Sequence, residues 1–106
     1  MKRAATDANH TEIAHALQAT GASVHNTHRV GGGFADLCVG IAGLNLLVEV
    51  KTATGKLNEN EQRFHQDWRG QIAVVRTVEE AVALVERWRE LGYALGELAR
   101  EMETHR

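Results

Sequence analysis

Three charged residues near the middle of the chain have types and spacing suited to chemistry: Asp36, Glu49 and Lys51. Asp36 precedes a short apolar run at 37–39, and Glu49 and Lys51 end a longer apolar run at 44–51. Two such runs joined by a short glycine-containing link are typical of a β-hairpin. Strand side chains alternate between faces, so Glu49 and Lys51 share one face. The other face, which we expect to be buried, holds Leu44, Leu46, Val48 and Val50.

The hairpin is expected to bring the two acids together. We expect Val39 to pair with Leu44 across a four-residue loop. Asp36 then lies opposite Leu47, and Glu49 is its diagonal neighbour on the same face. Diagonal pairs lie roughly 7–8 Å apart. Two carboxylates at that separation can bind one divalent cation.

This arrangement resembles the PD-(D/E)XK nuclease superfamily, with Asp36 and Glu49 as the acid pair and 49–51 as the E-x-K element. Within the superfamily the chain is most similar to the VRR-NUC branch, small nucleases often carried by phages. The resemblance covers roughly residues 12–88. One position departs from the pattern, because Ala35 precedes the acid where the family usually has proline.

The resemblance implies a restriction-endonuclease-like core that hydrolyses DNA with Mg²⁺ or Mn²⁺. Lys51 then orients the attacking water or stabilises charge on the phosphate, and Gln62 joins the catalytic residues. Glycines 31–33 either let a main chain approach closely before the acid or form a plain loop. The implied metal ligands are Asp36, Glu49, the Val50 carbonyl and Glu12 of the first helix; a solvated helix acid is the alternative for Glu12.

The choice of metal follows from the ligand types. Mg²⁺ prefers carboxylate, carbonyl and water oxygens, and it lowers the pKa of a bound water. No Cys/His cluster has zinc spacing. Two other interpretations remain open. Glu49 and Lys51 can form an ion pair at a strand edge with Asp36 in a turn, or the chain can be a non-catalytic nucleic-acid-binding or protein-binding module that keeps the nuclease fold.

Length and charge fit one small domain, residues 1–106. A chain of 106 residues can bury a single core. The net charge of −2 is not typical of a nucleic-acid binder. The last thirty residues contribute −3, from seven glutamates and four arginines, and the remainder +1. No apolar run has transmembrane length and no secretory signal is visible, so we expect no membrane association and a cytoplasmic location, in a bacterium or a phage-infected host cell.

The segment before the hairpin predicts one helix and one strand. The helix begins at Thr6 or Asp7, which are good N-caps, and ends near Thr20. A strand follows at 23–29 and includes His28. The residues expected on the buried side of the helix are Ile13, Leu17, Ala14 and Ala16.

A second helix is predicted directly after the hairpin. Asn58 and Glu61 form a capping-box pattern at its start, and Gly70 ends it. One side of this helix is largely apolar and the other is polar, and we expect the polar side to line the site. The apolar side holds Leu57, Glu61, Phe64 and Trp68, and the polar side holds Gln62, Gln66 and Arg69.

The last elements complete an α/β fold of the order α-β-β-β-α-β-α. A strand at 71–75 is expected to run parallel to the strand of Glu49 through a right-handed crossover, giving a mixed sheet flanked by helices. A third helix begins at a second capping-box pattern, Thr77 and Glu80. Residues 92–106 form a possible helical extension.

That extension carries more apolar residues than one small core needs: Leu91, Leu95 and Leu98 follow Trp88. An exposed apolar stripe is commonly covered by a second copy of the chain. We therefore expect a homodimer formed partly through this segment. By resemblance to the junction-resolving members of the family, the dimer is expected to prefer branched DNA to linear duplex.

Overall fold

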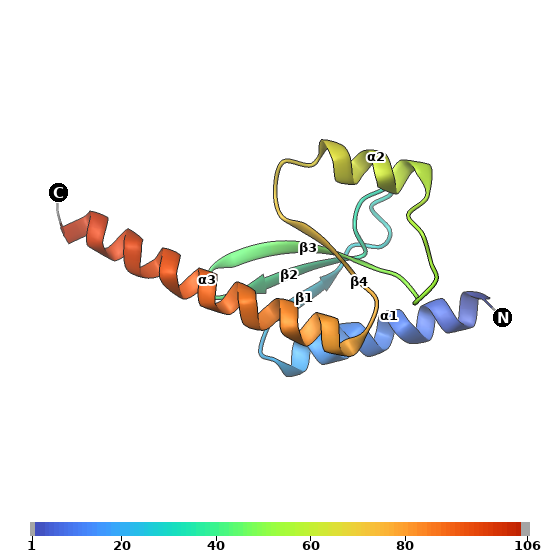
Figure 1. The fold of residues 1–106 in the computed structure, drawn as a ribbon, viewed down its shortest axis with the longest axis horizontal. Helices are drawn as coiled ribbons and strands as arrows, with labels where there is room; N and C mark the ends of the chain where they lie inside the picture. The colour runs from blue at the N-terminus through green and yellow to red at the C-terminus, as the bar shows by residue number, and fades with distance from the viewer. Residues whose placement is uncertain (1, 105–106) are drawn as a thin grey trace.

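The computed structural model describes residues 2–104, which form three helices and a four-stranded sheet (Figure 1). The elements are α1 (Lys2–Ala19), β1 (Ser23–Asn26), β2 (Leu37–Ile41), β3 (Leu44–Val50), α2 (Glu59–Asp67), β4 (Ile72–Val75) and α3 (Val78–Thr104). The predicted order of helices and strands is confirmed. Within the described residues, no helix combines the length and the apolar character needed to cross a membrane.

The sheet has the strand order β1-β2-β3-β4. β1 pairs with β2 and β2 with β3 in antiparallel orientation, whereas β4 is parallel to β3, with Glu49 beside Val74. The predicted parallel pairing is therefore confirmed, and the sheet is mixed. Parallel neighbours need a crossover connection, and here the crossover contains α2.

The turn between β2 and β3 is tighter than predicted. Ile41 pairs with Leu44, so the loop consists of Ala42 and Gly43. Both loop residues have positive φ, 50° and 82°, as in the two-residue turns whose twist matches the strands. The predicted pairing of Val39 with Leu44 is wrong by two residues. An even shift in register leaves every side chain on its predicted face.

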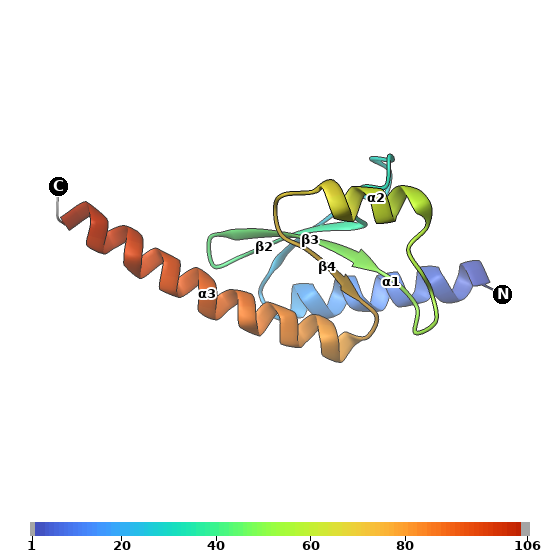
Figure 2. The ribbon, with the colours of Figure 1, turned by 45° about the horizontal axis from the view of Figure 1, so that its top comes forward.

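Two layers of helix enclose the sheet. Both ribbon views place α1 and α3 on one face and α2 on the other (Figures 1 and 2). The main core lies between the sheet and the α1–α3 pair, because the fully apolar face of β3 points that way. The largest side chains of this core are Ile13, Leu17, Leu37, Val39, Leu46, Val48, Val75 and Val85.

The bounds of α1 differ from the prediction at one end. The helix begins at Lys2 and not at Thr6 or Asp7, since the alanines before Thr6 are strong helix formers that carry the helix past both candidate caps. Its C-terminal end is as predicted. Gly21 follows with a φ of 96°, and its amide N–H donates to the Gln18 carbonyl.

β1 is shorter than predicted, and His28 lies outside it. The strand ends at Asn26, whose side-chain oxygen accepts a hydrogen bond from the His28 main-chain N–H at 2.8 Å. Such Asx turns end strands. The Thr27 hydroxyl then donates to the Ala35 carbonyl at 2.7 Å. The loop therefore folds back onto the residue before Asp36.

α2 and α3 end differently from the predictions. α2 ends at Asp67 with Trp68 as its C-cap, so Gly70 does not end it. The capping box of Asn58 and Glu61 is confirmed. α3 is one helix to Thr104 and projects beyond the sheet (Figure 1), which gives the molecule extents of 57 × 30 × 20 Å. The final two residues of the predicted 92–106 extension lie outside the described range.

Of the two hydrogen bonds of the second predicted capping box, only one forms. The Glu80 main-chain N–H donates to the Thr77 hydroxyl at 3.1 Å, which caps the first turn of α3. The Glu80 carboxylate instead accepts from the Arg76 main-chain N–H at 3.1 Å. The Glu80 carboxylate therefore bonds to the main-chain N–H of Arg76, one residue before the Thr77 N–H that a capping box uses.

Candidate active site

Asp36 and Glu49 face each other where β2 begins and β3 ends. Leu37 pairs with Val48, and continuing that register by one residue sets Asp36 opposite Glu49. The predicted diagonal arrangement, with Asp36 opposite Leu47, is therefore replaced by a closer one. Asp36 is 9% exposed and Glu49 is 1% exposed. Two carboxylates directly opposite on one face, both buried, repel each other unless a proton or a cation lies between them.

The Asp36 carboxylate is fixed by two hydrogen bonds. Its Oδ2 accepts from the Val50 main-chain N–H at 2.9 Å, and its Oδ1 lies 3.1 Å from His28 Nδ1. The first bond ties the carboxylate to β3 next to Glu49. The second bond depends on the turn that ends β1 at Asn26, because this turn brings the His28 side chain next to Asp36.

The Glu49 carboxyl group is only partly satisfied by hydrogen bonds. Its Oε2 is buried and has no hydrogen-bond partner among the described residues. Burial, followed by the hydrogen bond with Glu61 and the negative charge of Asp36, raises the pKa of Glu49 to about 9. In the metal-free protein at neutral pH, Glu49 therefore holds a proton.

Lys51 lies between two carboxylates. Its Nζ is 2.8 Å from Glu61 Oε1 and 3.7 Å from Glu49 Oε1. Burial lowers the pKa of Lys51, but the hydrogen bond to Glu61 and the neighbouring acids outweigh burial, so the net pKa lies above its ordinary value. Burial likewise raises the pKa of Glu61, but Lys51 and the Asn58 main-chain N–H outweigh it and the net pKa is lowered.

Glu61 is the site residue that the sequence did not reveal. The polar side of α2 was expected to line the site, but the aromatic side faces the sheet and carries Glu61 with it. The Phe34 and Phe64 rings meet edge to face at 5.2 Å, which fixes this orientation. In the sequence, the capping box indicated only where the helix begins. In the structure, the Glu61 carboxylate accepts hydrogen bonds from both the Asn58 main-chain N–H of the cap and the Lys51 ammonium. Gln62 is exposed and donates to the Leu57 carbonyl at 3.0 Å, pointing away from the acids.

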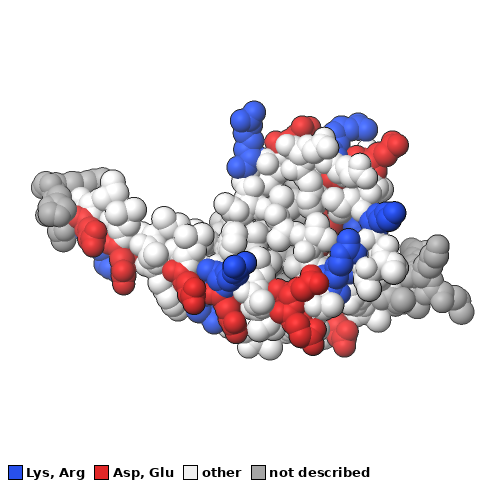
Figure 3. Space-filling view, viewed as in Figure 1, with Lys and Arg blue, Asp and Glu red and all other residues white. Residues whose placement is uncertain are grey.

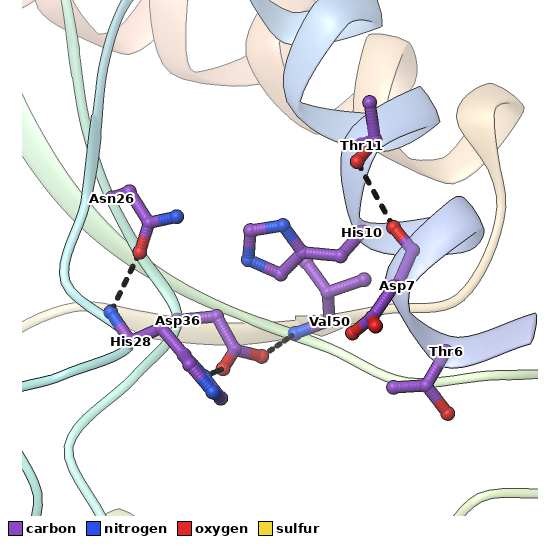
Figure 4. Close-up of a pocket in the computed structure, with 8 residues that line it drawn as sticks. All are labelled: Thr6, Asp7, His10, Thr11, Asn26, His28, Asp36 and Val50. Atoms are coloured by element: carbon purple, nitrogen blue, oxygen red, sulfur yellow. Dashed lines mark hydrogen bonds and ion pairs between the residues drawn. The ribbon is translucent and has the colours of Figure 1, made fainter. Parts of the chain in front are cut away.

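A pocket of about 260 Å³ opens beside Asp36 between α1 and the end of β1 (Figure 4). From α1 it is lined by His10, among others, and from the opposite side by His28. The two imidazole rings meet at 6.2 Å, and His10 Nε2 is buried without a partner among the described residues. Glu12, the acid expected near the metal, is exposed and does not line this pocket.

The glycine loop makes the close approach that the sequence left as one of two alternatives. A Cβ placed on Gly33 would lie 2.3 Å from the Asn60 carbonyl oxygen, and the Gly33 φ is 82°. Both facts require glycine at this position. The contact joins the loop that leads to Asp36 to the first turn of α2, which carries Glu61. This main-chain contact therefore helps to hold the two halves of the site together.

The segment after Lys51 is held by two side chains from distant parts of the sequence. Arg76 donates to the Thr52 and Gly55 carbonyls, each at 2.6 Å. Asn9 of α1 donates to the Lys51 carbonyl at 2.9 Å. These bonds fix the main chain on the C-terminal side of Lys51 and therefore its side-chain direction.

Asp36 and Glu49 are two side chains of the site that could serve as oxygen ligands for a divalent cation. Across residues 2–104, no group of three or more His, Cys, Asp and Glu side chains is arranged to hold a metal ion. Asp36 and Glu49 supply two carboxylates, and the buried, unpartnered Oε2 of Glu49 is an oxygen available to a cation. Mg²⁺ typically takes one or two protein carboxylates and completes its shell with other oxygens and water.

No protein-family model, curated protein or solved structure gives a significant match to this chain.

Proposed function

We propose that this protein is a Mg²⁺-dependent DNA endonuclease of the PD-(D/E)XK type. One observation carries the proposal: Asp36 and Glu49 stand opposite each other, buried, with Lys51 beside Glu49 directly after the end of β3. The mixed sheet, with α2 over one face and α1 over the other, is compatible with a restriction-endonuclease-like core. At the position where the family usually has proline, this chain has Ala35, a small side chain that is buried.

Mg²⁺ or Mn²⁺ would be held by Asp36 and Glu49, with the Val50 carbonyl and water completing the shell. The bound metal supplies charge stabilisation and a more acidic water. We leave Glu12 out of the ligand set, because it is exposed and away from the pocket at Asp36. Gln62 is likewise outside the proposed catalytic set, because its amide is bonded to Leu57.

Asp36, Lys51 and Glu61 have different roles in the proposed reaction. Asp36 is held in place by Val50 and His28, so its carboxylate needs little reorganisation when it binds a cation. Lys51 presents a positive charge beside Glu49, where it can stabilise negative charge on a phosphate oxygen and hold an attacking water. Glu61 acts as a positioning residue, because it holds the Lys51 ammonium at hydrogen-bond distance.

The alternatives are weaker for physical reasons. A simple Glu49–Lys51 ion pair does not describe the site, because Lys51 is closer to Glu61 than to Glu49. A non-catalytic module would gain nothing from two facing buried acids, because keeping both carboxyl groups buried costs stability when no cation binds. A metal-dependent function accounts for the two buried acids, because both would bind the cation.

We further propose that a second copy of the chain covers the apolar stripe of α3. Along α3, apolar residues recur at alternating intervals of four and three, which is a coiled-coil seam. Arg87 and Glu101 lie at equal distances on either side of Ala94, so an antiparallel pair crossing at Ala94 would bring Arg87 near Glu101 of the partner subunit. The seam consists of Leu84, Trp88, Leu91, Leu95, Leu98 and Met102, of which the last four are exposed.

A metal-dependent cleavage assay tests the proposed function. The protein is incubated with a labelled four-way junction and with a linear duplex of the same sequence, in Mg²⁺, Mn²⁺, Zn²⁺ or EDTA. We expect cleavage in Mg²⁺ and Mn²⁺, none in EDTA, and faster cleavage of the junction. Absence of cleavage of either DNA in every metal would refute the nuclease proposal, and equal rates on both would refute the preference for branched DNA.

A further inference from the structure

An aromatic cluster lies on the α2 side of the molecule, next to the proposed active site. Trp68 stacks on Phe64 with ring centroids 5.3 Å apart and an interplanar angle of 18°. Phe34 meets both rings edge to face, at 5.2 Å and 6.2 Å. Phe34 and Phe64 are half-buried, whereas Trp68 is 40% exposed. The cluster therefore supports an indole that is rigidly held and still open to solvent.

This indole has a fixed relation to the acids. Phe34 precedes Asp36 by two residues, and Glu61 of α2 precedes Trp68, the C-cap of that helix, by seven residues. Seven helical residues span about 10 Å along the helix axis. Trp68 therefore lies about 10 Å from Glu61, which is about three stacked base steps at about 3.4 Å each, or fewer nucleotides of an extended single strand.

The charges of this part of the surface favour a polyanion. From the loop after β1 to the loop after α2, four exposed basic residues accompany two exposed acids away from the site. None of the four basic side chains pairs with another residue in the described part of the chain. The basic residues are Arg29, Lys56, Arg63 and Arg69, and the acids are Glu59 and Asp67.

The opposite side of the molecule has the reverse balance. α3 carries seven glutamates and three arginines. Figure 3 shows acidic side chains along α3 and both blue and red groups over α2. A polyanion is therefore repelled from α3 and steered towards the α2 side, where Trp68 is exposed.

We propose that Trp68 is a stacking platform for an unpaired base of DNA within a few nucleotides of the scissile phosphate. Exposed aromatic rings in basic surroundings bind single-stranded nucleic acid by stacking, since every base offers a π-face. A base in a continuous duplex is already stacked on its neighbours, so Trp68 selects DNA that has unpaired or splayed bases, as at a junction or flap. This inference rests on the proposed nuclease function for the choice of DNA as ligand.

The test is a binding experiment that requires no cleavage. The full chain is titrated in EDTA with oligothymidylate and, separately, with a blunt duplex. The intrinsic fluorescence is followed in a Trp88→Phe background, so that Trp68 is the single tryptophan. Stacking predicts that oligothymidylate quenches Trp68 fluorescence strongly and that the duplex quenches it much less. Unchanged Trp68 emission when oligothymidylate is bound would overturn the proposal.

Substitutions separate stacking from packing. Trp68→Ala is expected to weaken oligothymidylate binding by about tenfold or more and duplex binding by less than about twofold. Trp68→Phe keeps the aromatic cluster and should retain most of the binding. Tyr93→Ala is the matched control, because Tyr93 is an exposed aromatic residue on α3. Equal losses for Trp68→Ala and Tyr93→Ala, or no loss in either, would refute the proposal.

The outcomes for binding and for cleavage are independent. If Trp68 quenching is observed but no DNA is cleaved in any metal, the stacking platform stands and the nuclease proposal fails. If DNA is cleaved but Trp68→Ala binds oligothymidylate as well as the wild type does, the platform is wrong and the nuclease proposal stands.

Discussion

Lys51 Nζ lies 2.8 Å from Oε1 of Glu61, a residue of α2, the helix in the crossover between β3 and β4. The same carboxylate oxygen also accepts the Asn58 main-chain N–H at 2.9 Å. Glu61 therefore links the start of α2 to the proposed catalytic lysine. Its role can be tested without disturbing the helix, because glutamine at this position of a capping box can also bond to the N-cap amide.

Glu61→Gln is expected to lower the rate of cleavage while leaving α2 intact. The substitution removes the negative charge that holds the Lys51 ammonium, and a misplacement of a catalytic group by about 1 Å can lower the rate by about 100-fold. Because Lys51 is proposed to act on the reacting phosphate, kcat should fall and KM should change little. Glu59→Gln, an exposed acid of the same helix turn, is the control and should leave kcat unchanged. Equal rates for the wild type and Glu61→Gln would contradict the positioning role.

Asp36→Ala, Glu49→Ala and Lys51→Ala are each expected to abolish Mg²⁺-dependent cleavage without unfolding the protein. The two acid variants should also lose binding of Mn²⁺ measured by calorimetry, since each removes a proposed ligand. Lys51→Ala should still bind Mn²⁺, because lysine is not a ligand. Circular dichroism spectra matching the wild type are required of all three. Cleavage that persists in all three variants would remove the basis of the nuclease assignment.

The pKa of Glu49 predicts that the metal-free protein loses stability as pH rises. Between its ordinary value of 4.5 and about 9, the folded state holds a proton that the unfolded state has released. Unfolding then releases that proton, so the free energy of unfolding falls by at most about 1.4 kcal/mol per pH unit. Urea unfolding in EDTA between about pH 5 and pH 8 measures this slope, within the window set by the two pKa values.

Glu49→Gln isolates this effect from the titration of the histidines. Glutamine has a similar shape and no titration, so the variant should show a flatter slope and should be more stable than the wild type at neutral pH in EDTA. Saturating Mg²⁺ should flatten or reverse the wild-type slope, because the cation favours ionised Glu49. The same slope in the wild type and in Glu49→Gln would show that Glu49 is ionised in the metal-free fold.

The stripe on α3 predicts a homodimer that one charge can disrupt. Leu95→Lys places a charge in the centre of the seam and should convert a dimer to a monomer, as measured by light scattering at tens of micromolar. Truncation after Glu90 should have the same effect. Tyr93→Lys is the control, because Tyr93 is exposed but lies outside the seam. A wild-type monomer, or a dimer that survives Leu95→Lys and the truncation, would exclude this interface.

Much of the fold follows from local sequence patterns. The spacing of Ile13 and Leu17 identifies the buried side of α1, and both are fully buried. The alternation along β3 separates Val48 from Glu49, because a strand has a side-chain period of two residues. The pair of Asn58 and Glu61 marks the start of α2 through hydrogen bonds between near neighbours. Such features depend on contacts that the chain makes within a few residues.

The tertiary structure decided what local patterns leave open. The turn at Ala42 and Gly43 set the register, and so placed Asp36 opposite Glu49 and not on its diagonal. The capping box fixes where α2 begins but not which way it faces, and the packing of Phe34 on Phe64 turned Glu61 towards Lys51. These contacts join residues far apart in the chain, and their geometry depends on how whole elements pack. Residue spacing in the sequence was therefore enough to identify Asp36, Glu49 and Lys51 as candidate site residues. Only the packing of the elements determined which residues these three contact.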